Sequence, residues 1–190
     1  MTNQSLIKIQ AATAAEICAR FDLAEKSLPL LRDGMGPREF VEALLTNKQY
    51  RAGIDFLAHA LPAREAVWWG CLCLQHACGN NLSAPDKTAA KATVQWVMRP
   101  TEQNRAAAKA PAEAAKAPSP AGALAMATSL TGGSMAPPNL PPAPPPPFAW
   151  AAYVATAIKF AAIKVESAKI TETHRLFVEL GVGLAEGRYT

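Results

Sequence analysis

The densest group of metal-binding residue types in this sequence is Cys71, Cys73, His76 and Cys78, with the spacing C-x-C-x-x-H-x-C. Structural zinc sites usually draw their thiolate and imidazole ligands from two elements, with a C-x(2–4)-C pair on a turn. Here one helix is predicted to carry the whole group, and only Cys71 and Cys78 share a face of it. We therefore interpret the cysteines as small apolar residues with free thiols, and we expect no metal.

A second candidate for chemistry is the set Arg64, Glu65 and His76 on the same segment. Acid–base catalysis needs convergent titratable groups, and the sequence alone assembles no such pair. It also contains no G-x-S-x-G, H-E-x-x-H, P-loop or G-x-G-x-x-G motif. We therefore expect a protein that is not an enzyme and binds no cofactor. The alternative is an enzyme of unfamiliar type with a site near these three residues.

The element that must position these side chains is a helix predicted to run from Pro62 to the Gly79-Asn80 pair, which is typical of a helix end. At 100° per residue, one arc of about 120° contains several polar side chains and two large apolar ones. The residues on this arc are Arg64, Glu65, Trp68, Leu72, Gln75 and His76. The polar residues mark the outward side, so Trp68 and Leu72 are expected on the surface of the helix.

The rest of the chain indicates further short helices and no strands. Helices are predicted over residues 11–21, 37–45, 50–61, 85–97, 101–110, 121–130, 148–165 and 168–186. Val94, Val97 and Met98 are expected to be buried. The prediction is an all-α protein whose residues 1–190 form one compact irregular helical domain, with residues 1–9 flexible. An α-solenoid-like stacking of helix pairs remains open.

A proline-rich stretch, residues 131–147, interrupts this pattern, and eight of the eleven residues from 137 to 147 are proline. The two helices after it are too short to fold alone. In polyproline II, eleven residues span roughly 34 Å. We therefore predict an ordered strap within the domain that covers Trp68 or Trp69, with Pro137, Pro138, Leu140 and Pro141 as contact residues. A mobile linker and a ligand for a partner protein are the alternatives.

The charge and hydropathy patterns exclude several partner classes. The net charge is only +4, and no run of basic residues with interleaved aromatics indicates nucleic-acid binding. The apolar run from Phe148 to Ile158 is about half as long as a bilayer requires. The N-terminus lacks the pattern of a signal peptide. These features predict a cytoplasmic protein that contacts neither nucleic acid nor membrane.

Two motifs resemble those of one uncharacterised bacterial family of small helical proteins. The first, L-P-x-R-E-A-V-W-W, covers residues 61–69, and the second, G-G-S-x-A-P-P-x-L-P-P-x-P-P-P-P, covers residues 132–147. Members of that family are encoded near components of type VI secretion systems. The resemblance implies an accessory role in effector loading or assembly.

Together these features favour a non-enzymatic adaptor or co-chaperone that binds another protein, with a secretion effector or its chaperone as the expected partner. An exposed apolar groove on the folded domain would distinguish such an adaptor from the alternatives. A structural subunit that works as an oligomer is a further alternative.

Overall fold

A computed structural model describes residues 5–115, 118–136 and 139–189, and over these residues the chain is helical without strands. The α-helices are α1 (Ala14–Cys18), α2 (Pro37–Thr46), α3 (Tyr50–Ala60), α4 (Ala63–Cys78), α5 (Ala84–Met98), α6 (Glu102–Ala107), α7 (Lys109–Ala114), α8 (Pro120–Ser129), α9 (Ala149–Ala162) and α10 (Ile170–Ala185). Short 3₁₀ helices occupy Glu25–Leu30 and Ser167–Lys169. The predicted all-α class is confirmed.

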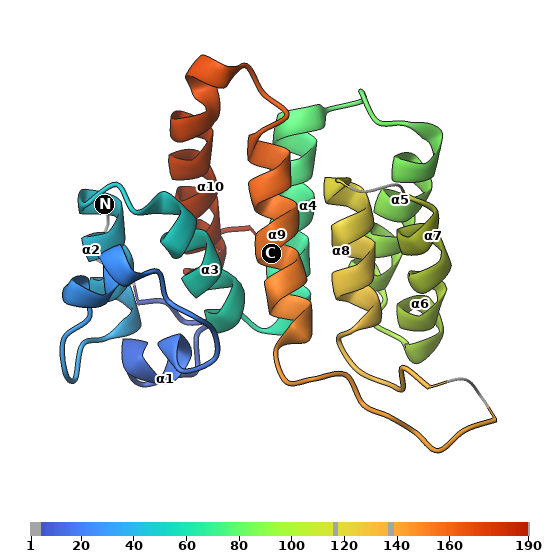
Figure 1. The fold of residues 1–190 in the computed structure, drawn as a ribbon, viewed down its shortest axis with the longest axis horizontal. Helices are drawn as coiled ribbons and strands as arrows, with labels where there is room; N and C mark the ends of the chain where they lie inside the picture. Colours follow the sequence, from blue (N-terminus) through green and yellow to red (C-terminus); the bar gives the residue numbers. More distant parts are fainter. Residues whose placement is uncertain (1–4, 116–117, 137–138, 190) are drawn as a thin grey trace.

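Helices α4 and α9 lie at the centre of the molecule, with α9 in front of α4 in Figure 1. On one side α10 and α3 pack against this pair, and α1 and α2 lie beyond α3. On the other side α8 packs against α9, and α5 and α7 pack against α8. A single cluster of buried apolar residues runs through these helices. The C-terminal helices are therefore built into the same core as the N-terminal ones.

Local sequence signals account for where the helices start. The Ser83 hydroxyl accepts a hydrogen bond of 3.3 Å from the Asp86 amide, and the Ser83 hydroxyl also donates to the Asp86 carboxylate at 2.7 Å. These bonds satisfy part of the first turn of α5, as expected from the Ser-x-x-Asp pattern. Pro37, Pro85 and Pro120 all lie in the first turn of a helix, where a missing N–H costs nothing.

Residues 5–9 differ from the expectation that residues 1–9 are flexible, and residues 1–4 lie outside the described residues. Within the described residues 5–9, Leu6 is buried. The Lys8 amide donates a hydrogen bond of 3.0 Å to the carbonyl of Ala185 at the end of α10. This carbonyl is one of those that the end of a helix leaves without a partner. This mostly polar segment therefore packs against the end of α10, because its backbone bonds to a free carbonyl there and Leu6 becomes buried.

The proline-rich segment also differs from its prediction, because none of its described residues, 131–136 and 139–147, covers Trp68 or Trp69. It projects from the ends of α8 and α9 as an exposed arm (Figure 1). The Ser134 hydroxyl accepts hydrogen bonds of 3.0 Å from the amides of Ala136 and Ala143. The Met135 amide donates to the Ala143 carbonyl at 2.8 Å. The arm therefore folds back on itself, so it is too short to cross the domain as the predicted strap would.

The far end of the arm is fixed by Phe148, the N-cap residue of α9, which has a left-handed φ of 57°. The Arg20 guanidinium lies 4.7 Å from the centre of its ring, and the His59 ring lies 6.4 Å away. A cation over an aromatic face is attractive. These contacts anchor the arm next to α1 and α3, whereas the face of α4 that carries Trp68 is turned away from α9.

Candidate functional site

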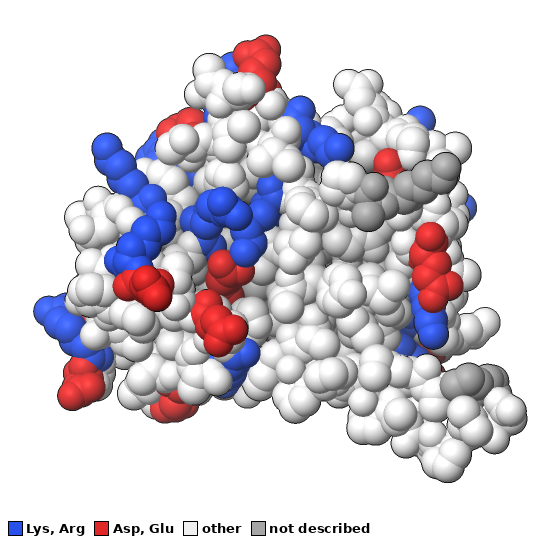
Figure 2. All heavy atoms as spheres, viewed as in Figure 1, with Lys and Arg blue, Asp and Glu red and all other residues white. Residues whose placement is uncertain are grey.

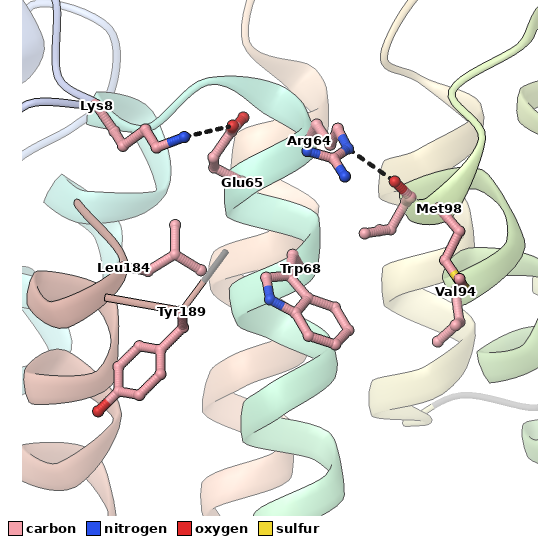
Figure 3. Close-up of a pocket in the computed structure, with 9 residues that line it drawn as sticks. Lys8, Arg64, Glu65, Trp68, Val94, Met98, Leu184 and Tyr189 are labelled. Carbon is pink, nitrogen blue, oxygen red and sulfur yellow. Dashed lines mark hydrogen bonds and ion pairs between the residues drawn. The ribbon is translucent and has the colours of Figure 1, made fainter. Parts of the chain in front are cut away.

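An open groove of about 450 Å³ lies between α4, α5 and α10, on the side of α4 opposite to α9 (Figure 3). Its lining comprises Lys8, Arg64, Glu65, Trp68, Val94, Val97, Met98, Leu184 and Tyr189. Trp68 occupies the centre, with Met98 and Val94 on the α5 side and Leu184 and Tyr189 on the α10 side (Figure 3). We call this the Trp68 groove. It combines an apolar floor with charged residues at one end.

The charged end of the Trp68 groove is held in place by interactions with its neighbours. The Arg64 Nε donates a hydrogen bond of 2.7 Å to the carbonyl of Val97 near the end of α5. The Lys8 Nζ lies 3.6 Å from Glu65 Oε1 (Figure 3). Arg64 therefore ties α4 to α5, and Glu65 ties α4 to the N-terminal segment.

One residue of the apolar wall, Met98, was predicted to be buried in the core and is not. Val97 is buried as expected, but the Met98 side chain is 73% exposed. Met98 is the last residue of α5, so its side chain reaches over the groove rather than into the core. Tyr189 is also exposed, at 42%. Methionine adapts its shape to different apolar surfaces, and exposed methionines are common at binding surfaces.

The predicted outward arc of α4 holds in part, because Arg64, Gln75 and His76 are exposed, whereas Glu65, Trp68 and Leu72 are half-buried. The structure does not bring the alternative catalytic set together. His76 is twelve residues from Arg64, or about 18 Å along the helix. His76 instead lies with its ring centre 5.9 Å from that of Phe177. Arg64 and Glu65 are thus part of the groove, and His76 is not.

The other predicted site residues lie apart from the groove. Trp69 is fully buried in the core, and Leu72 packs against that core. Leu140 and Pro141 are exposed on the arm. Pro137 and Pro138 lie outside the described residues. The sequence therefore identified three residues of the groove, namely Arg64, Glu65 and Trp68. Sequence reasoning did not assign the remaining lining residues to a site, because they come from α5 and from the two ends of the chain and no spacing pattern relates them to α4. These residues are Lys8, Val94, Val97, Met98, Leu184 and Tyr189.

The four cysteines are free, and Cys71 and Cys73 are buried. Burial raises the pKa of Cys71 to about 12 and that of Cys18 to about 11, and it raises the pKa of Cys73 well above its ordinary value. A protonated thiol is a poor nucleophile and a poor metal ligand. In the described part of the chain, no group of three or more His, Cys, Asp or Glu residues has the geometry to hold a metal ion. Cys71 and Cys73 therefore act as core residues, and Cys18 and Cys78 pack against the core.

Residues 40–185 match a family of unknown function, DUF6931, and the chain belongs to that family. The match includes α4, α5 and α10, which form the walls of the Trp68 groove. No curated protein and no solved structure is significantly similar to the chain. Among the described residues, no helix has the length and apolar character needed to cross a membrane.

Proposed function

We propose that the protein is a non-enzymatic adaptor that binds an apolar segment of another protein in the Trp68 groove. The observation that carries this proposal is a tryptophan at the centre of an open apolar groove, with an exposed methionine at its edge. Tryptophan is enriched among residues that dominate binding energy at protein interfaces. Leaving Met98 in water is unfavourable unless a partner covers it.

The ends of the groove suit a peptide rather than a small polar substrate. Arg64, Glu65 and Lys8 lie together at one end, while Trp68 and Leu184 supply apolar surface along the rest. A protein segment with apolar side chains and one polar or charged flank would complement this arrangement. The resemblance to proteins encoded beside type VI secretion genes makes a secretion effector or its chaperone the partner that we propose.

Site-specific photo-crosslinking in the native host tests this proposal. A photoreactive residue in place of Met98 should capture a partner, and Trp68→Ala in the same chain should abolish that capture. The matched control places the photoreactive residue at Tyr153, which is 42% exposed on α9. Tyr153→Ala should leave capture at position 98 intact. Capture at position 98 that survives Trp68→Ala, or no capture there at all, would contradict the proposal.

A further inference from the structure

A second hollow of about 400 Å³ lies between α3, α9 and α10, and the first 3₁₀ helix and the turn between α2 and α3 border it. Its charged lining residues are Lys26, Lys48, Arg51, Asp55 and Lys159, and His174 also lines it. We call this the basic pocket. These cationic side chains come from three separate parts of the chain, around residues 26, 48–51 and 159, and the fold brings these parts together.

The charges in the basic pocket do not balance. Asp55 is its one acidic residue, and Asp55 Oδ1 lies 2.5 Å from the Lys159 Nζ. Within the described residues, Lys26, Lys48 and Arg51 take part in no ion pair. Three positive charges therefore remain around one hollow. In Figure 2, Lys and Arg gather on the half of this face that holds α3 and α10, with Asp and Glu side chains among them.

Two polar side chains that line the pocket, Gln49 and His174, have buried groups. Gln49 Oε1 is buried without a hydrogen-bond partner, and His174 is only 8% exposed. Burial first, and then the charges of Arg51 and Lys159, lower the pKa of His174. A neutral imidazole adds no further repulsion among the cations. A buried amide oxygen is costly to leave unsatisfied.

Lys48 occupies an unusual backbone position at the rim. It follows the end of α2 with a left-handed φ of 57°, a conformation that glycine or asparagine adopts at less cost. Its amide donates to the Leu45 carbonyl at 3.0 Å, which completes the helix end. A lysine here directs its ammonium group to the same hollow as Arg51 and Lys26.

We propose that the basic pocket binds a multiply charged oxyanion of the phosphate class, either free phosphate or the phosphate group of a larger ligand. Arginine and lysine side chains form charge-assisted hydrogen bonds with phosphate oxygens, and three unpaired cations exceed what a single carboxylate would neutralise. The volume exceeds that of one phosphate ion, so an organic portion can also enter. This site is separate from the Trp68 groove, and its test is independent of the adaptor proposal.

Calorimetric titration of the full-length protein at constant ionic strength tests the proposal, with inorganic phosphate and glycerol phosphate as probes. Both should bind saturably at one site, and Arg51→Gln or Lys48→Gln should weaken binding about tenfold or more. Lys87→Gln is the matched control, because Lys87 is exposed on α5 and far from the pocket. It should leave the affinity unchanged. Tighter binding of glycerol phosphate would identify an organic ligand, and equal binding would identify the phosphate group alone.

A second measurement separates a site from general charge screening. An anion in the pocket offsets Arg51 and Lys159, so saturating phosphate should raise the pKa of the His174 ring, followed by NMR. Heat that does not saturate with phosphate, equal weakening by Lys87→Gln, or a His174 pKa that does not respond to phosphate would each overturn the proposal. Unchanged thermal unfolding of the three variants would show that any loss of binding is local.

Discussion

The indole Nε1 of Trp69 donates a hydrogen bond of 2.8 Å to the backbone carbonyl of Phe177, across 108 residues of sequence. A buried indole N–H needs such a partner. The bond joins α4 to α10, and Trp69 is fully buried there. Its sequence neighbour Trp68 points to the open groove on the same helix. Two adjacent tryptophans therefore have different roles, one in the core and one at a surface.

This difference predicts opposite results for two alanine variants. Trp69→Ala should lower the free energy of unfolding by about 3–5 kcal/mol, because it leaves a large cavity in a packed core. Trp68→Ala should lower it by about 1 kcal/mol, because the side chain is half-buried. Urea unfolding followed by circular dichroism measures both. Equal losses for the two variants would show that Trp68 belongs to the core.

Two glycines of α10 give a second matched pair. A Cβ at Gly181 would lie 2.8 Å from Trp69 Cε2 and 3.0 Å from Leu57 Cδ1. Gly181→Ala should therefore destabilise the protein by a net of about 1–2 kcal/mol, since overpacking a core outweighs the gain in helix propensity. A Cβ at Gly183 meets the outer atoms of Tyr189 and Arg188, which can move aside. Gly183→Ala should be neutral or stabilise by up to about 1 kcal/mol, and thermal unfolding compares the two.

Much of the fold follows from the sequence because helix signals are local. Pro37, Ser83 and the Gly79-Asn80 pair lie where the sequence places helix boundaries, within one or two residues.

The groove could be predicted only in part, because its walls meet through tertiary contacts. Nothing in the periodicity of α5 shows that Met98 lies beyond the core, and no spacing pattern brings Lys8 to Glu65. The basic pocket was missed for the same reason, since Lys26, Arg51 and Lys159 come from separate elements. The arm was misplaced because composition predicts stiffness and reach but not direction.

Stability should fall on acidification below the ordinary histidine pKa of about 6.5. Burial is the main cause that lowers the pKa of both His59 and His174. At pH values between the lowered folded pKa and 6.5, the unfolded chain binds more protons, so the free energy of unfolding decreases as the pH falls through that window. Above 6.5 both states are neutral and this contribution is constant. Urea unfolding from pH 7.5 to 5 measures the slope, and His59→Gln should reduce it. A stability that rises as the pH falls would contradict the assignment.

The thiols should resist alkylation in the native state. Because burial raises the pKa of Cys71 and Cys73 most strongly, these two should react with iodoacetamide at pH 8 only after unfolding. Cys18 and Cys78 are partly exposed and should react first, although still slowly because their pKa values are raised. Mass spectrometry of peptides from native and urea-treated protein measures the order. Rapid native labelling of Cys73 would show that α4 opens readily.

The exposed arm should be the first site of proteolysis, and cutting it should not separate the molecule. Met135 is 44% exposed on the arm, and thermolysin cleaves before such residues, whereas Pro141 blocks cleavage before Leu140. The two fragments should co-elute in gel filtration, because α9 and α10 pack against α3 and α4. Trp68→Ala should leave the cleavage rate unchanged, since no described residue of the arm lines the Trp68 groove. Faster cleavage in Trp68→Ala would mean that the arm reaches the groove in solution, and separation of the fragments would mean that the core does not join them.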